Sequence, residues 1–255
     1  LLKDISRDRQ VEELKDGFLR TVSHELLTPL TSVIGFIDLT RSGTGGSLSE
    51  KQETYLNTAH KEASTLKDLI NDLLDLSQLN AGKMSMRYSY TDINDLLTNI
   101  VETFMPLAKG KQLQLSSDLP DTPISASVDA KKLRRILINL ISNALKFTES
   151  GAITVGVREK KSALEFWVQD TGIGLLEEEK EIIFEKFRQI DYSSTRKYDG
   201  IGLGLSIVQQ LVSLHKGQIS VKSKIKKGTT FTFTILPQAP NRSPHSTQDQ
   251  ASLTS

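Results

Sequence analysis

The chain has 255 residues, enough for one large domain or two moderate ones that each bury a core. Its 32 basic and 31 acidic residues nearly cancel, which predicts no general attraction to nucleic acid or to anionic lipid. It has no cysteine, so disulfides, thiolate metal sites and cysteine nucleophiles are excluded and a cytoplasmic location is expected. No run approaches the ~18 apolar residues of a membrane span, so any anchor of a longer protein would lie outside this segment.

The first helix is expected to run up to a glycine-rich loop at residues 42–51. Its apolar positions recur every three or four residues, which is typical of a helix that packs on other helices. These positions are Leu19, Val22, Leu26, Pro29, Val33 and Phe36. His24 falls opposite this stripe, so its imidazole is expected to face solvent, with Thr28 one turn away on the same side. A single histidine on a helix is usually an ordinary residue, so His24 needs support from the rest of the chain.

A second helix is expected after Ser49 and Gln52, which have the spacing of a capping box. Its apolar positions keep the same spacing from Leu56 to Ser77. Two long helices joined by a short loop predict an antiparallel hairpin over residues 15–84. Residues 1–14 lead into it as a signalling helix or coiled coil, or as an ordinary solvated helix start. Because a lone hairpin leaves one face uncovered, we expect two copies to form a homodimeric four-helix bundle.

The pattern changes at residues 81–88, and residues 85–237 mix helices with strands. Helices are expected at residues 93–108, 131–147 and 203–215, and strands at residues 112–119, 124–129, 152–161, 163–170 and within 218–236. Asp129 has the position of a helix cap. This order predicts an α+β two-layer sandwich, one sheet backed by helices. Residues 238–255 are polar and are expected to form a disordered tail.

Three short motifs in the second domain carry residues suited to nucleotide binding. Asn139 and Asn143 share a helix face with Lys146, and two amide oxygens and an ammonium suit a hydrated Mg²⁺ and its phosphates. Asp170 opens DTGIG directly after a strand, where a carboxylate can accept from an exocyclic amine. GIGLGL, residues 200–205, opens a helix whose N-terminal amides favour anions. Each motif alone has an ordinary structural explanation, but all three in this order are far more specific.

HELLT also resembles the start of a zinc-protease motif. That motif is HExxH, and it requires a second histidine where this chain has Thr28. The other histidines, His60, His215 and His245, have no metal-site spacing. A zinc protease is therefore excluded.

Over residues 10–237 the chain resembles the catalytic core of two-component sensor histidine kinases. The motifs that carry the resemblance, in order, are SHELLTPL (phosphoacceptor box), DAKKLRRILINLISNALKFT (N box), DTGIG (first glycine box), IIFEKFRQID (F box), GIGLGL (second glycine box) and GTTFTF (third glycine box). The resemblance implies a dimerisation and phosphotransfer hairpin followed by a GHKL-type ATP-binding domain. It also implies ATP and Mg²⁺ as cofactors, a response regulator receiver domain as partner and an upstream sensor domain. Asp4–Ser6 (DIS) resembles the exit of a PAS sensor domain.

The resemblance implies roles for individual residues. His24 would be phosphorylated on a ring nitrogen, with Glu25 as its base, and Thr28 would position water when the partner is dephosphorylated. Asn143 would ligate Mg²⁺, with Asn139 as a supporting ligand. The remaining implied nucleotide contacts are Lys146 at a phosphate, Phe147 beside the base, Asp170 at the adenine amine, Gly172 and Gly174 along the base, Gly200, Gly202 and Gly204 under the phosphates, and Gln189, Arg196 and Lys197 near the γ-phosphate. Leu27 departs from the family, which commonly has Arg there.

Two other functions compete with this one. The chain could be a nucleotide switch that hydrolyses ATP without a phosphohistidine, or a scaffold or phosphatase that binds nucleotide weakly. Related ATPases of this fold, such as type II topoisomerases and mismatch-repair proteins, carry Glu where this chain has Asn139. Because an amide cannot take a proton from water, the sequence favours transfer to His24 over hydrolysis.

Overall fold

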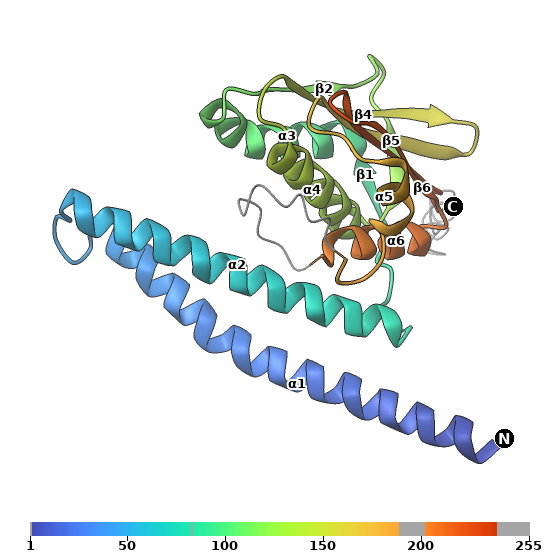
Figure 1. Ribbon diagram of the computed structural model, residues 1–255, viewed down its shortest axis with the longest axis horizontal. Helices are drawn as coiled ribbons and strands as arrows, with labels where there is room; N and C mark the ends of the chain where they lie inside the picture. The colour runs from blue at the N-terminus through green and yellow to red at the C-terminus, as the bar shows by residue number, and fades with distance from the viewer. Residues whose placement is uncertain (1, 83, 189–201, 239–255) are drawn as a thin grey trace, which may run out of the picture. The chain divides into compact units, whose positions relative to one another are not determined.

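The structure is a computed structural model that describes residues 2–82, 84–188 and 202–238, without the side chains of residues 2–20, 24 and 80 (Figure 1). The described residues divide into two compact units. The first contains the described residues up to Ser85 and those within 182–210, and the second contains residues 86–181 and those described from Leu211 onward. Among the described helices, none is long and apolar enough to cross a membrane. The tail expected beyond residue 238 lies outside the described residues.

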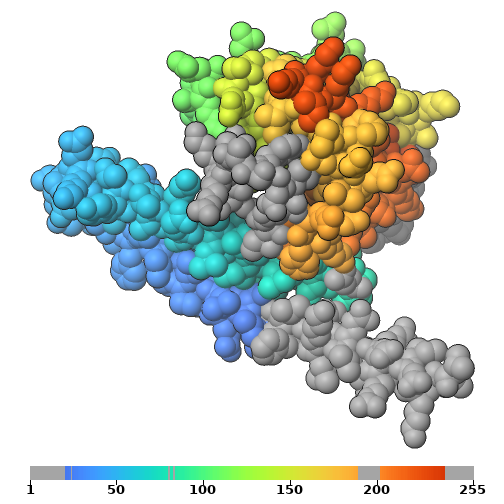
Figure 2. Space-filling view, in the orientation of Figure 1, coloured from blue at the N-terminus to red at the C-terminus, as the bar shows by residue number. Residues whose placement is uncertain are grey.

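The first unit contains the expected helical hairpin. Helices α1 (Leu2–Arg41) and α2 (Glu50–Asn80) run side by side (Figure 1). In Figure 2 the coloured atoms of residues 21–41 and of α2 form a continuous surface. The predicted capping box is confirmed: Ser49 accepts from the N–H of Gln52, whose side chain accepts from the N–H of Ser49. His60 Nε2 of α2 lies 3.2 Å from Asp38 Oδ1 of α1. Pro29 lies inside α1, which remains helical on both sides of it.

The apolar stripe of α1 stays open to solvent in the single chain. Leu26 is 49% exposed, Val33 50% and Phe36 71%. Isolated surface apolar residues are common, but a run of them at helical spacing along one helix face is a candidate interface.

The second unit is built on a five-stranded sheet in the order β2-β4-β5-β7-β6 (Figure 1). Its strands are β2 (Gln114–Asp118), β4 (Ala152–Lys160), β5 (Ala163–Asp170), β6 (Ile219–Lys224) and β7 (Gly228–Ile235). β2 and β4 are parallel, and all other neighbours are antiparallel. Phe166 and Phe233 face each other across β5 and β7, with ring centroids 5.0 Å apart in the core. This packing fixes the position of β5, and Asp170 is the last residue of that strand.

Helices α3 (Ile93–Gly110) and α4 (Ala130–Phe147) pack on this sheet, which confirms the two-layer α+β sandwich. Two further helices follow in the chain: α5 (Glu177–Ile182), within a stretch expected to be loop, and α6 (Gly204–Leu214). The buried face of α4 consists of Leu133, Ile136, Leu137, Leu140, Ile141, Ala144 and Leu145. One face of α4 thus belongs to the core, and the opposite face is available for a ligand.

Asp129 caps α4 as predicted. Its Oδ1 accepts from the N–H of Lys132 at 3.1 Å, and its Oδ2 accepts from the N–H of Arg87 and from Lys132 Nζ, both at 2.8 Å. Burial alone would raise the pKa of Asp129, but these hydrogen bonds and the Lys132 charge lower it below its usual value. The cap therefore holds an ionised carboxylate at the start of α4.

Strand β1 (Ser89–Asp92) was not predicted. It pairs antiparallel with β3 (Ser125–Val128) in a separate two-stranded sheet. SYTD has no alternation of apolar and polar residues, so its local pattern does not indicate a strand. The strand depends on a partner that is distant in the sequence.

Candidate functional site

The ligand face of α4 carries Asn139, Asn143, Lys146 and Phe147, all partly exposed. Asn139 Nδ2 donates to the carbonyl oxygen of Arg135 at 3.1 Å, which leaves Oδ1 as the atom that can accept or ligate. Lys146 Nζ lies over the ring of Phe147, 5.2 Å from its centroid. Two amides and an ammonium thus follow one side of α4 towards its C-terminus.

Asp170 ends β5 and is 6% exposed. Its Oδ1 accepts from two N–H groups, that of Gly172 at 2.8 Å and that of Thr229 at 3.2 Å. Its Oδ2 receives no hydrogen bond from the described part of the chain. Burial raises the pKa of Asp170, and the two backbone hydrogen bonds oppose part of that rise. The largely buried Asp170 therefore presents one carboxylate oxygen as an open acceptor.

The turn after β5 packs directly on the end of α4. The N–H of Ile173 donates to the carbonyl oxygen of Phe147 at 3.2 Å. A Cβ on Gly172 would lie 2.3 Å from that same oxygen. Gly174 has φ +72°, and a Cβ there would lie 2.1 Å from the carbonyl oxygen of Lys224. The structure thus brings Asp170, both glycines and the C-terminal end of α4 together.

The second glycine box is only partly described. Gly202 has φ +74°, and its carbonyl oxygen accepts from the N–H of Phe187 at 3.1 Å. Gly204 is the first residue of α6. Gly200 and the predicted lid residues Gln189, Arg196 and Lys197 lie outside the described residues.

The predicted phosphoacceptor residues lie on α1. Glu25 and Thr28 are exposed, and Ser23 is buried. The expectation that the imidazole of His24 faces solvent lies outside the described side chains. The backbone of His24 is helical, five residues before Pro29.

Three residues near Asp170 were missed by sequence reasoning. Thr229 lies in the GTTFTF motif, which was noticed without any role for that residue. Ser223 had no signal in the sequence, yet its Oγ accepts from the N–H of Leu175 at 2.8 Å. Thr148, directly after α4, is buried, and its Oγ1 has no hydrogen-bond partner among the described residues.

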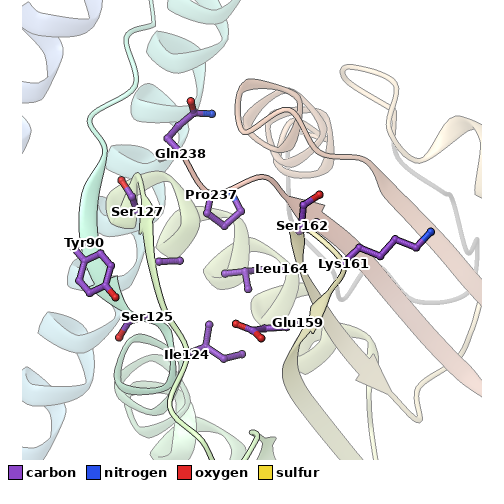
Figure 3. A pocket seen from close by; sticks show the side chains of 12 residues that line it. Tyr90, Ile124, Ser125, Ser127, Glu159, Lys161, Ser162, Leu164, Pro237 and Gln238 are labelled. Carbon is purple, nitrogen blue, oxygen red and sulfur yellow. The ribbon is translucent and has the colours of Figure 1, made fainter. Parts of the chain in front are cut away.

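A cavity of about 270 Å³ lies at the opposite end of β5, beside the β4–β5 turn (Figure 3). Its lining includes Tyr90, Ser125, Ser127, Glu159 and Lys161 and none of the predicted site residues. The two ends of β5, Ala163 and Asp170, are about 23 Å apart at ~3.3 Å per residue. This cavity is therefore separate from the predicted nucleotide site.

The chemistry of the site fits an adenine nucleotide. Asp170 Oδ2 and Thr148 Oγ1 are polar atoms of buried residues without a protein hydrogen bond among the described residues, as a ligand-binding site requires. No cluster of three or more His, Asp or Glu side chains that could hold a metal occurs in the described ranges. The oxygen donors on the ligand face of α4 are amides, which suit Mg²⁺ shared with phosphates.

Two family models match the chain. Residues 14–82 match the His Kinase A phospho-acceptor domain, and residues 128–240 match the ATPase domain found in histidine kinases, DNA gyrase B and HSP90. The chain belongs to the histidine kinases, with a helical phosphoacceptor region followed by an ATP-binding α/β domain.

Individual relatives agree with this assignment. The chain is 42% identical over 227 residues to the circadian input-output histidine kinase CikA of Synechococcus elongatus, covering 88% of this chain and 30% of that protein. It is 38% identical over 238 residues to the signal transduction histidine-protein kinase BarA of Escherichia coli, covering 90% of this chain and 25% of that protein. Full-length ShkA, solved in complex with AMPPNP, superposes with a TM-score of 0.72 at 30% identity, over 88% of this chain and 46% of that one. The chain thus spans less than a third of these two curated relatives.

Proposed function

We propose that the chain phosphorylates its own His24 with ATP and passes the phosphoryl group to an aspartate of a response regulator receiver domain. The observation that carries the proposal is Asp170, whose open Oδ2 lies beside the end of α4 in a chain that also contains a phosphoacceptor helix. In the first step the γ-phosphate leaves ADP and bonds to a ring nitrogen of His24. The attacking nitrogen uses its lone pair, and the proton on the other ring nitrogen of His24 goes to Glu25.

Each side of the nucleotide has a proposed partner. Asp170 Oδ2 accepts from the adenine amine, Gly172 and Gly174 lie along the base, and Phe147 packs beside it. Lys146 contacts a phosphate, and Asn143, with Asn139 in support, holds Mg²⁺, which neutralises phosphate charge. The proposed contacts of the phosphates and the lid are Gly200, Gly202, Gly204, Gln189, Arg196 and Lys197.

Histidine suits this transfer because a neutral imidazole is nucleophilic near pH 7, its ordinary pKa being about 6.5. Glu25 is exposed next to His24, where it can orient the ring and take its proton. Thr28, also exposed, would position water when the partner is dephosphorylated. The exposure of both residues supports access by the ATP-binding domain and then by the receiver domain.

The proposed assembly is a homodimer through residues 15–84, with residues 85–237 as the ATP-binding domain. The exposed stripe of Leu26, Val33 and Phe36 supports this, because a second hairpin would cover it and form a four-helix bundle. An upstream sensor domain, of PAS type by the DIS motif, would act through residues 1–14. The proposed location of the chain is the cytoplasm.

Incubation with γ-labelled ATP tests the kinase step. The wild type is expected to acquire an acid-labile label that chases onto a receiver domain, and His24→Gln is expected to lose it completely. Asn143→Asp, which places a negative charge beside the phosphates, is expected to reduce labelling at least tenfold. Labelling that survives His24→Gln would refute the assignment. Steady phosphate release that is unaffected by His24→Gln would identify an ATPase switch instead.

A further inference from the structure

We infer that Ser223 is a positioning residue that aims the Asp170 carboxylate at the adenine ring. The inference rests on the proposed function, because it concerns the same nucleotide site. Ser223 lies near the end of β6, an edge strand, and is half-buried. It does not touch the proposed ligand and acts through other groups.

The Ser223 hydroxyl joins three segments of chain. Its Oγ accepts from the N–H of Leu175 at 2.8 Å, and it lies 2.9 Å from the carbonyl oxygen of Gly228 and 2.9 Å from Thr229 Oγ1. A hydroxyl has one proton and two acceptor positions. If Ser223 donates its proton to the Gly228 carbonyl oxygen, it accepts from the Leu175 N–H and from the Thr229 hydroxyl. All of its hydrogen-bonding positions are then occupied.

Thr229 connects this network to Asp170. Its N–H donates to Asp170 Oδ1, as does the N–H of Gly172. Gly228 packs so closely that a Cβ there would lie 1.9 Å from the carbonyl oxygen of Asp170. Because both N–H groups bind Oδ1, they determine the direction in which Oδ2 points. Ser223 thus holds Thr229, which donates to Asp170, and Leu175, which follows Gly172 in the turn after β5.

The fold does not depend on this hydroxyl. A separate backbone hydrogen bond, from the N–H of Lys226 to the carbonyl oxygen of Ile173 at 2.7 Å, also ties the turn after β5 to the β6–β7 turn. Removing the hydroxyl therefore leaves both turns attached and frees the Leu175 N–H, the Gly228 carbonyl oxygen and the Thr229 side chain. The expected defect is a loosened Asp170 in a folded domain.

The test compares Ser223→Thr with Ser223→Val in the full chain, because Thr and Val have the same shape and differ in the hydroxyl. Affinities for ADP and for inorganic tripolyphosphate are measured by calorimetry. Ser223→Val is expected to bind ADP about five- to tenfold more weakly, the loss that corresponds to about one hydrogen bond. Tripolyphosphate binding is expected to stay within twofold of the wild type, and Ser223→Thr is expected to restore ADP binding.

Ser220→Ala is the matched control. Ser220 lies on the same strand, and among the residues that the structure describes its hydroxyl reaches only the carbonyl oxygen of Thr232, at 3.4 Å. The inference is overturned if Ser223→Val binds ADP like the wild type, if it loses ADP and tripolyphosphate equally, or if Ser220→Ala reproduces its defect. Because the readout is equilibrium binding, a wild type that binds ADP but never forms phosphohistidine refutes the proposed function and leaves this inference testable.

Discussion

The N–H of Ile173 donates to the carbonyl oxygen of Phe147 at 3.2 Å. This bond joins the turn that follows Asp170 to the last residue of α4. It satisfies one of the carbonyl groups that a helix leaves free at its C-terminus. It also places Asp170, the carboxylate proposed to bind the adenine base, next to α4, the helix proposed to bind Mg²⁺ and phosphate. The geometry of the site thus depends on a backbone contact between two elements that are separated in the sequence.

Asp170→Asn is expected to weaken ATP binding about tenfold to a hundredfold, the usual loss for a hydrogen bond to a charged group. The amide oxygen should stay on the two N–H donors of Gly172 and Thr229, which places the NH₂ group where Oδ2 now lies. A donor there faces the donor of the adenine amine. Comparison of ATP with GTP by calorimetry checks this, since the carbonyl of guanine suits an NH₂ group. Unchanged preference for ATP would show that Asp170 does not read the base.

Asp170 should also destabilise the ligand-free domain at neutral pH. Burial raises the pKa of Asp170 in the folded state, so its ionised carboxylate opposes folding above that pKa. This penalty disappears as the pH falls below the pKa of Asp in the unfolded chain, about 4. Asp170→Asn is therefore expected to melt at a higher temperature than the wild type at pH 7, with the difference shrinking at acidic pH. Thermal melts without nucleotide measure this. A lower melting temperature at pH 7 would contradict it.

Asp129→Ala is expected to cost about 2 kcal/mol or more, because it removes a helix cap and leaves Lys132 without its carboxylate. The pKa of Asp129 is lowered in the folded state, so its ionised form stabilises the fold above pH about 4, and this contribution is lost as the pH falls through the folded pKa. Urea unfolding at pH 7 and at acidic pH measures the loss. Asp129→Asn, which can still cap the helix, is the control and should recover part of the stability. Equal stability of Ala and wild type at pH 7 would contradict the role of the cap.

His215 should make the second unit acid-sensitive. It is fully buried, its Nδ1 lies 2.8 Å from the carbonyl oxygen of Leu211, and Nε2 has no partner among the described residues. Burial lowers the pKa of His215, and the Leu211 carbonyl and the Asp129 carboxylate offset this only in part, while Lys132 adds to it. A lowered histidine pKa means that stability falls as the pH drops below about 6.5, where the unfolded chain takes up the proton first.

His215→Gln, which keeps an N–H donor but does not titrate near neutrality, is expected to flatten this acid dependence. Urea unfolding at pH 8.0, 6.5 and 5.5 gives the slope for each protein. Parallel curves for wild type and His215→Gln would show that His215 is not responsible.

Phe36→Glu is expected to convert the proposed homodimer into a monomer, because it places a charge at the most exposed residue of the apolar stripe of α1. Size-exclusion chromatography with light scattering measures the mass. Thr31→Glu is the control, since Thr31 is exposed on α1 on the side away from Phe36. A dimer that persists in Phe36→Glu would place the interface elsewhere.

Local signals in the sequence were sufficient for the long helices and their caps, although not for the short helix α5. Ser49, Gln52 and Asp129 act on N–H groups within three residues, so sequence spacing alone reveals them. The site is different. The N–H of Thr229 reaches Asp170 across 59 residues of chain, and Ser223 reaches Leu175 across 48. Contacts between residues so far apart in the sequence leave no local pattern. The four-residue strand β1 was missed for the same reason, because it pairs with the distant β3.

Helix α4 has a buried face formed by residues such as Leu137 and Ile141 and a ligand face formed by Asn139 and Asn143. Successive residues on a helix differ by about 100° in direction, so even a modest rotation of α4 would swing the amides away from their ligand. The volumes of the buried side chains therefore set the rotational angle at which the amides are held. Core substitutions that preserve stability can still disable nucleotide binding, and sequence variation on the buried face of α4 should be limited by catalysis as well as by folding.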